Sequence, residues 1–428
     1  MDTTMKFTRT LIILLTMVFV ASCDKEYLDP FATLEPDVVS SEENLINLIN
    51  GLQRRVSTDR PSSIYTVATT TGLNTAELRL LNPGNLGENE ILLGGTEVSG
   101  DNEVLSNMWS QLMLTRKEAT LVIDNASVAS STARANTIEA YGLFYRALAH
   151  GTLIQYFERV PLTIGENSEF NDRSAVLASV IADLNEAVSL ASSGDNSISL
   201  TSTFDISDVS HAMLARYQLM SGDFDGAISN AAQASTTNTS NVWTYDAAFP
   251  NPLAFWFSSN NVHQARDQNF GLSGALAPDP ADERIAFHTS VDPEDATNFL
   301  VEGFYQSNTT SIPVYLPGEM LLIQAEAHAR QNEITEAISF LDQVLTKTSA
   351  TDAFGLGANL AAYAGANDQS SVLDEIYRNR RIELYLVGLA LEDTRRFNRP
   401  DSDFNRVYYP YPNDERDNNS NTPDNPSN

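Results

Sequence analysis

The sequence contains little cysteine and little positive charge. Cys23 is the only cysteine among 428 residues, and 26 lysine and arginine residues stand against 56 aspartate and glutamate residues, a formal net charge of −30. A single cysteine excludes an internal disulfide and a metal site built from cysteines. The acidic balance repels nucleic-acid phosphates and anionic lipid, so we set nucleic-acid binding aside and interpret the acidity mainly as a source of solubility.

Motifs of common catalytic sites are also missing. The sequence has five histidines, no two of them close together, and no HExxH pair. It has no Walker loop, no GxGxxG after a predicted strand and no GxSxG elbow. The acidic run at 292–295 lacks the spacing of a calcium loop. Paired glycosidase carboxylates are harder to exclude, because they meet in space and not in sequence. We predict no catalytic residue, no cofactor and no metal site.

The one cysteine stands at an informative place. Lys6 and Arg9 precede an apolar run at 11–20, which is shorter than the about 20 residues of a spanning helix but fits the core of a signal peptide. The small residues directly before Cys23 match a bacterial lipobox. We therefore predict a lipoprotein signal peptide over 1–22 and acyl chains on Cys23 as the only membrane attachment. The alternative is an ordinary secretory signal with a chance cysteine.

Helical periodicity dominates the rest of the sequence. Ser40 and Glu43 have capping-box spacing, and apolar residues then recur at helical spacing. A helix predicted over 134–157 is apolar on several faces, which is typical of a central buried helix. Another helix is predicted over 174–192. Residues 57–104 are rich in Thr, Gly and Asn and are predicted to be mostly loop.

Two later segments share the pattern of a helix hairpin. In the first, Ala215 precedes Ala227 by twelve residues, and in the second Ala325 precedes Ala337 by the same distance, with a Gly or Asn turn between them. Small residues at these places let two antiparallel helices approach closely. The pattern resembles tetratricopeptide units, and a plain helix hairpin is the alternative.

Several stretches together resemble the SusD/RagB family of surface lipoproteins. These stretches are 23–30, 139–148, 156–162, 182–187, 315–327, 376–384 and 393–397. The resemblance implies an all-α dominated fold, with a tetratricopeptide-like helix-hairpin scaffold, long loops and a few short strands. It also implies a lipid-anchored protein on the outer membrane, facing the cell exterior, that captures a glycan for a partner TonB-dependent (SusC-like) transporter and catalyses nothing. Two alternatives remain: the same role with peptide or another nutrient as cargo, and a helical-repeat scaffold that binds only protein.

The expected organisation follows from these patterns. After the signal peptide at 1–22 we expect an N-terminal region over 23–200 and a C-terminal region over 201–412. Residues 241–311 are rich in Pro, Asn, Ser and Gly and are predicted to form a loop-rich insertion with short strands. The polar tail at 413–428 is predicted to be disordered.

A glycan site needs a flat aromatic ring for the C–H face of a sugar and amides or charged groups for its hydroxyls. One segment of the insertion holds both kinds of group, and its ligand-binding candidates are Trp256, Phe257, Asn260, His263 and Arg266. In a strand, Trp256 would face away from Phe255 and Phe257. The alternative is that all three aromatic side chains belong to the core.

By analogy with the family, an N-terminal loop is expected to supply a second wall, with candidates Tyr65, Asn74, Glu77 and Arg79. Other residues are assigned to structure: Trp109 to the core, and Trp243, Tyr245 and Phe249 to packing of the hairpins. The Arg-rich closing segment is predicted to form an ion-pair network rather than a ligand site. Its members are Arg380, Arg381, Glu383, Asp393, Arg395 and Arg396.

Overall fold

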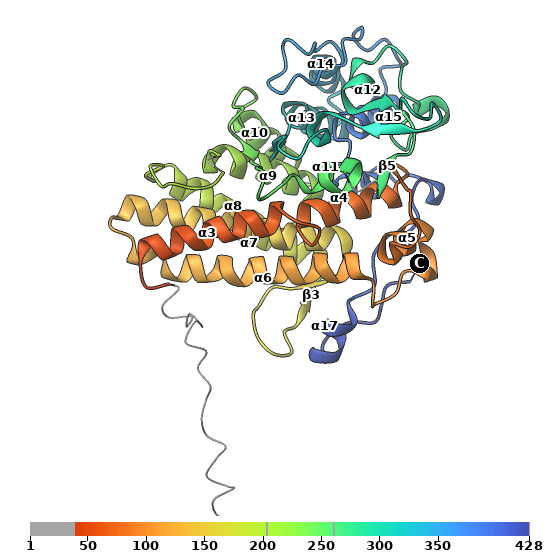
Figure 1. Cartoon of the computed structure of the whole chain (residues 1–428). Helices are drawn as coiled ribbons and strands as arrows, with labels where there is room; N and C mark the ends of the chain where they lie inside the picture. The colour runs from red at the N-terminus through yellow and green to blue at the C-terminus, as the bar shows by residue number, and fades with distance from the viewer. Residues whose placement is uncertain (1–38, 203, 260–261, 428) are drawn as a thin grey trace, which may run out of the picture. The chain divides into compact units, whose positions relative to one another are not determined.

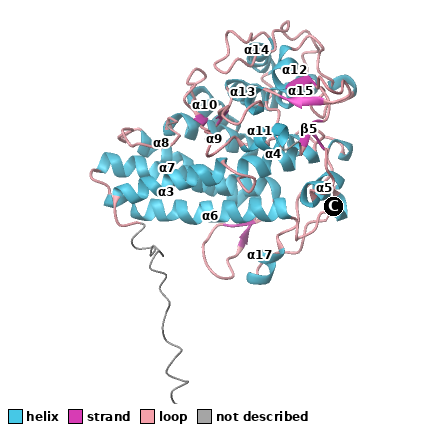
Figure 2. Ribbon diagram, in the orientation of Figure 1, coloured by secondary structure: helices cyan, strands magenta, loops and turns pink. Residues whose placement is uncertain are grey.

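The structure, a computed structural model, describes residues 39–202, 204–259 and 262–427 (Figures 1 and 2). Cys23 and the predicted signal peptide lie outside the described residues. Fifteen α-helices in the described residues confirm the predicted helical fold class. They are α3 (Glu42–Ser57), α4 (Ser63–Asn74), α5 (Leu86–Leu93), α6 (Glu103–Asn125), α7 (Thr132–Tyr156), α8 (Arg173–Ala191), α9 (Ile206–Ser221), α10 (Phe224–Gln233), α11 (Pro252–Ala254), α12 (Glu283–His288), α13 (Pro317–Arg330), α14 (Ile334–Leu345), α15 (Gln369–Glu383), α16 (Ala390–Arg396) and α17 (Asn413–Asn418).

The strands are short and form three small antiparallel sheets. A four-stranded sheet has the order β1-β5-β7-β6, and β2-β3 and β4-β8 are two-stranded. Their bounds are β1 (Leu78–Leu80), β2 (Val160–Pro161), β3 (Phe170–Asn171), β4 (Val242–Trp243), β5 (His263–Ala265), β6 (Thr289–Val291), β7 (Phe299–Val301) and β8 (Ile312–Pro313). Four of these eight strands, β4 to β7, lie in the predicted insertion at 241–311.

Helix α7 is the centre of a helical layer. It packs against α3, α6, α8 and α9, and Figure 1 shows α3, α6, α7 and α8 side by side. Its buried residues lie on every face, as the all-round apolar pattern predicted. In the part of the chain that the structure describes, α8 alone is long and apolar enough to span a membrane, and it packs here against α7 and α9.

The segment at 57–104 is more regular than predicted. It contains α4, β1 and α5, so the prediction of mostly loop is wrong. Helix α4 is rich in threonine and β-branched residues, which have weak helix propensity. Burial stabilises it instead, and Thr66 and Thr75 satisfy their hydroxyls on backbone carbonyls one turn earlier. The predicted cap at Ser40 is also displaced, because Ser41 caps α3 by accepting from the backbone N–H of Asn44.

Both predicted helix hairpins are present. They are α9–α10 and α13–α14, and α10 also packs against α13. All four predicted alanines are fully buried between the paired helices. The turns use left-handed residues, Gly222 with φ 84° and Asn332 with φ 63°, which Gly and Asn tolerate best.

The aromatic segment of the insertion is not a strand. Pro252–Ala254 begins a helical turn, and Phe255–Ser259 continues it as a π-helix. The strand begins only at His263. The predicted alternation of Trp256 with its neighbours is therefore wrong. Asn251 explains the start of this turn, because its side chain accepts from the N–H groups of Leu253 and Ala254.

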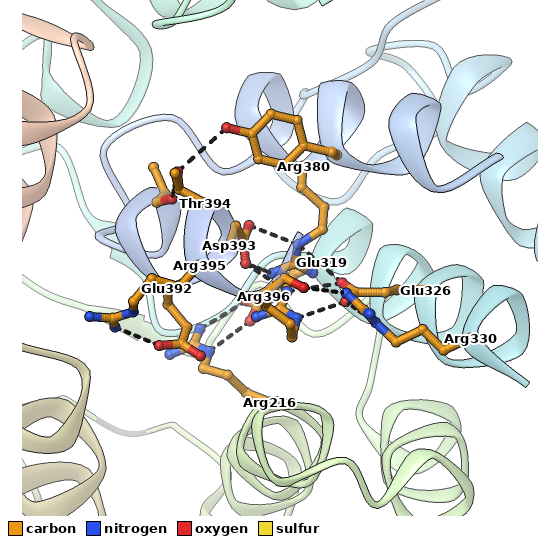
Figure 3. Close-up of polar contacts among 12 residues, drawn as sticks. Arg216, Glu319, Glu326, Arg330, Arg380, Glu392, Asp393, Thr394, Arg395 and Arg396 are labelled. Atoms are coloured by element: carbon orange, nitrogen blue, oxygen red, sulfur yellow. Dashed lines mark hydrogen bonds and ion pairs between the residues drawn. The ribbon is translucent and has the colours of Figure 1, made fainter. Parts of the chain in front are cut away.

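The Arg-rich closing segment forms the predicted ion-pair network (Figure 3). Glu326 of α13 is fully buried and pairs with Arg396 and Arg330. Asp393 pairs with Arg380 at 2.8 Å and with Arg396 at 2.7 Å. Burial opposes the charge of Glu326, but the surrounding guanidinium groups outweigh it and lower its pKa to about 2. The network therefore ties α15 and α16 to α13.

The C-terminal tail is ordered where the structure describes it, so the prediction of disorder is wrong for residues 413–427. Glu415 of α17 accepts a hydrogen bond of 3.0 Å from the indole N–H of Trp109 on α6. Asn419 is buried and donates to the carbonyl of Ser168. Trp109 itself is a core residue, as predicted, stacked with Phe170. Hydrogen bonds of polar side chains hold this segment in place, and the amino-acid composition alone does not reveal such bonds.

Candidate functional site

The two predicted walls of a ligand site meet in the four-stranded sheet. Strand β1 pairs with β5, so that Arg79 lies opposite Gln264 and Leu80 lies opposite His263. Helix α4 packs against β1 and α11, and the π-helix at Phe255–Ser259 packs against β5. Segments nearly 200 residues apart in the sequence thus form one surface.

A guanidinium–aromatic pair marks this surface. The Cζ atom of Arg60 lies 4.7 Å from the ring centre of Trp256, within the range of a cation–π contact. Both side chains are partly exposed. Arg60 is fixed from below, since it donates to Glu88 and, at 3.0 Å, to the side-chain oxygen of Asn85. The surface therefore presents a flat ring, a guanidinium and an amide in fixed positions.

Buried residues hold this pair in place. Tyr65 is fully buried beneath Trp256, with ring centres 6.3 Å apart, and its hydroxyl donates to Glu88 at 3.1 Å. Because the hydroxyl hydrogen of Tyr65 is used in the bond to Glu88, the hydroxyl oxygen can accept a hydrogen bond from His263, whose Nε2 is 3.4 Å away. Phe257, also buried, meets His263 edge to face. These three predicted residues support the surface and do not reach solvent.

The buried residues beneath Trp256 are uncharged, and the Arg60–Glu88 pair supplies the charges at this surface. Burial, together with the nearby Arg60, lowers the pKa of His263 to about 3, so the imidazole is neutral at pH 7. Burial raises the pKa of Tyr65, and the Glu88 carboxylate raises it further. Burial opposes the charge of Arg60, but its hydrogen bond to Glu88 outweighs that cost and raises its pKa. The guanidinium of Arg60 is therefore a permanent cation.

The remaining predicted residues are spread more widely. Arg79 is partly exposed on β1 and donates to Gln264 and Asn298. Arg266, the residue after β5, is exposed, and its backbone N–H donates to the carbonyl of Glu77. Asn74 does not lie at this surface, because it is buried against Arg406 and Tyr409 of the C-terminal segment. Glu77 is buried near Arg381, at 3.6 Å. Asn260 lies outside the described residues.

Sequence reasoning missed Arg60, Asn85 and Glu88. Arg60 follows the end of α3, and Asn85 and Glu88 belong to the start of α5, in a segment that was predicted to be loop. Each gains its role from contacts 25 or more residues away, and no local pattern signals such contacts. Among the described residues, no group of three or more His, Cys, Asp or Glu side chains could hold a metal ion.

Comparison with known proteins identifies the class of fold. A SusD superfamily protein from Bacteroides vulgatus ATCC 8482 superposes with a TM-score of 0.72 at 15% identity, covering 90% of this chain and 99% of that chain. A SusD-like carbohydrate binding protein from the same organism gives 0.66 at 16% identity, covering 84% of each chain. A SusD superfamily protein from Parabacteroides distasonis ATCC 8503 gives 0.69 at 14% identity, covering 90% and 98%. At these identities the likeness shows a SusD-like fold.

The sequence also carries the family signal. Residues 301–427 match the model of the SusD family, and no curated protein matches the chain. The chain therefore has a SusD-like fold, and its residues 301–427 carry the sequence signal of the SusD family. The matched residues include α13 to α17 and the ion-pair network, but not the surface around Trp256.

Proposed function

We propose that the chain is a non-catalytic glycan-binding protein and that its ligand rests on the surface formed by Trp256, Arg60 and Asn85. The observation that carries the proposal is the fixed guanidinium–aromatic pair with an amide beside it. A partly exposed ring offers apolar area for a sugar face at small entropic cost. The guanidinium donates and the amide both donates and accepts, which suits hydroxyl groups.

The wider role follows from the family. We propose that Cys23 carries the lipid anchor, that the protein sits at the outer membrane and faces the exterior, and that it delivers its glycan to a TonB-dependent, SusC-like transporter. Peptide or another nutrient is the alternative cargo, and a scaffold that binds only protein is the alternative role. Replacement of Cys23 by Ala should release the protein from the membrane fraction. A variant that still fractionates with the outer membrane without its partner would contradict the anchor.

Affinity electrophoresis of residues 24–428 tests the binding function. The panel consists of soluble starch, xylan, mixed-linkage β-glucan and polygalacturonate, each cast in a native gel. We expect one polymer to retard the protein without becoming shorter, which also tests the absence of catalysis. If no polymer retards it, peptide cargo or binding only beside the transporter becomes the better explanation. If the polymer is shortened, the chain is an enzyme.

Variants locate the site. Trp256→Ala should weaken binding by more than about tenfold, as truncation of an aromatic anchor usually does. Arg60→Lys should weaken it nearly as much, because a lysine keeps the charge but loses the flat, forked donor group. Tyr408→Ala is the matched control, since Arg395 lies 4.5 Å over that ring elsewhere in the chain. Equal losses in all three variants would mean that the effect is structural.

A further inference from the structure

A second guanidinium–aromatic pair stands near the first. The Cζ atom of Arg54 lies 3.7 Å from the ring centre of Phe249, closer than Arg60 lies to Trp256. Arg54 is exposed in the last turn of α3, and Phe249 is partly exposed in the connection between β4 and α11. Phe249 therefore does not pack between the hairpins, and that prediction is wrong for this residue.

The same two segments of chain build both pairs. Arg54 and Arg60 lie six residues apart, and Phe249 and Trp256 lie seven residues apart in the same order. Only Pro250 and Asn251 separate Phe249 from the helical turn that begins at Pro252 and continues into the π-helix that carries Trp256. The two guanidinium–aromatic pairs therefore follow one another along the same two segments of the chain.

A recess of about 160 Å³ adjoins the Arg54–Phe249 pair. Its wall is rich in oxygen and nitrogen atoms, and besides the pair itself it includes Gln53, Thr58, Thr201, Thr244, Tyr245 and Asp246. Most of these side chains already have hydrogen-bond partners within the protein, so they are held in place: Thr58 donates to the carbonyl of Arg54, and Thr244 to that of Thr201. The recess is a small polar cup with a fixed wall.

One group at the recess has unused hydrogen-bonding capacity. Within the described residues the guanidinium of Arg54 has no carboxylate partner and no hydrogen bond, whereas Arg60 is paired with Glu88. The guanidinium of Arg54 can serve a ligand rich in oxygen, because it carries several N–H donors.

The recess and the surface at Trp256 are close enough for one oligosaccharide to reach both. Thr58 lines the recess, and Arg60 is only two residues further along, which puts their Cα atoms at most about 8 Å apart. We infer that the recess at Arg54 and Phe249 is a second saccharide subsite, which holds a further sugar residue of the same chain that is bound at Trp256. This inference rests on the proposed function and adds to it a preference for longer oligosaccharides.

Calorimetry with oligosaccharides of two to eight sugars, prepared from whichever polymer of the panel retards residues 24–428, tests the inference. Phe249→Ala and Arg54→Gln are the variants. Phe249 is not part of the hydrophobic core and Arg54 is exposed, so both variants should fold. We expect each to leave the Kd of the shortest binding oligosaccharide within about twofold and to weaken the longest by about five- to tenfold, the range of one lost contact of 1.0–1.4 kcal/mol.

The outcomes separate this inference from the proposed function. Binding that depends on Trp256 but changes equally for short and long ligands, or not at all, in the Phe249 and Arg54 variants overturns the second subsite alone. A wild-type chain that binds no polymer of the panel overturns both. The control Tyr408→Ala should leave the dependence on chain length unchanged, and a loss of that dependence in the control would also overturn the inference.

Discussion

Arg216 and Glu319 form a two-point ion pair between the first helices of the two hairpins. The Nε and Nη2 atoms of Arg216 donate to the two carboxylate oxygens of Glu319 at 2.7 and 2.8 Å. Glu319 is fully buried, and the guanidinium is nearly so. Burial opposes the charge of Arg216, but Glu319 outweighs that cost and raises its pKa. The pair fixes α9 against α13. The free-energy cost of removing both charges from water and the gain from their mutual attraction are both large.

Replacing one partner of this pair should lower the free energy of unfolding far more than replacing both partners together. Glu319→Leu leaves a buried cation without its partner and should lower the free energy of unfolding by about 3–5 kcal/mol. The double variant Arg216→Met with Glu319→Leu should recover most of this loss, because no buried charge remains. Urea denaturation at pH 7 measures all three proteins. Losses that simply add in the double variant would show that the two groups act independently.

A surface pair provides the control. Asp374 is well exposed and lies 3.3 Å from Arg399. Asp374→Asn should change the free energy of unfolding by less than about 1 kcal/mol, since exposed ion pairs contribute little. A loss as large as that of Glu319→Leu would mean that charge removal in general, and not burial, destabilises the protein.

Acid should destabilise the fold through its buried histidines. Burial, with Arg116 and Arg146 nearby, lowers the pKa of His150 to about 3, and the pKa values of His263 and His288 are lowered to about 3 mainly by burial. The unfolded chain takes up these protons near pH 6.5, whereas the folded chain does not until about pH 3. Between these two values the unfolded state binds more protons, so stability is present above about pH 6.5 and is lost as the pH falls.

Replacement of His150 isolates one part of this slope. Neither ring nitrogen of His150 has a hydrogen-bond partner in the described residues, so His150→Leu removes a titrating group and breaks no such bond. The slope of unfolding free energy against pH should become shallower by up to about 1.4 kcal/mol per pH unit between pH 6.5 and 3. Urea titrations at several pH values measure it. Leu177→Val is the control, and an unchanged slope in His150→Leu would contradict the pKa shift.

The sequence revealed local features well and long-range ones poorly. The hairpins were predictable because Ala215 and Ala227 repeat the spacing of Ala325 and Ala337, and close helix packing needs small residues at those places. Trp256 could be selected as an aromatic residue among polar ones. Its partner Arg60 could not, since their contact joins the end of α3 to the insertion across the fold. The π-helix was also missed, because a short apolar run does not distinguish a strand from a helical turn.

The tail shows the same limitation and yields a prediction. Residues 413–427 are polar throughout, yet the hydrogen bonds from Trp109 to Glu415 and from Asn419 to Ser168 hold them against the helical layer. Truncation after Pro412 should lower the free energy of unfolding by about 1–3 kcal/mol, the value of one or two buried hydrogen bonds. Thermal denaturation of the truncated chain measures this loss. An unchanged midpoint would restore the prediction of a loosely held tail.

Two glycines should respond to alanine in opposite directions. Gly388 has φ 92°, and a Cβ atom there would lie 2.0 Å from Cγ1 of Val67 on α4. Its carbonyl also accepts from the hydroxyls of Tyr156, at 2.9 Å, and Thr71. Gly388→Ala should therefore cost at least about 2 kcal/mol, from backbone strain and overpacking together. At Gly51, in the middle of α3, a Cβ atom meets nothing within 4 Å, and Gly51→Ala should stabilise by about 0.5–1 kcal/mol.

The cost at Gly388 has two sources that a second substitution separates. Val67→Ala removes the methyl group that the new Cβ atom would strike but leaves the positive φ unchanged. The double variant Gly388→Ala with Val67→Ala should therefore lose less stability than the sum of the two single losses, and the difference measures the collision alone. The loss that remains beyond that of Val67→Ala reports the strain of the left-handed backbone, expected at about 1–3 kcal/mol. If Gly388→Ala proves neutral, the loop has moved away from α4, and the hydrogen bonds from Tyr156 and Thr71 cannot be as described.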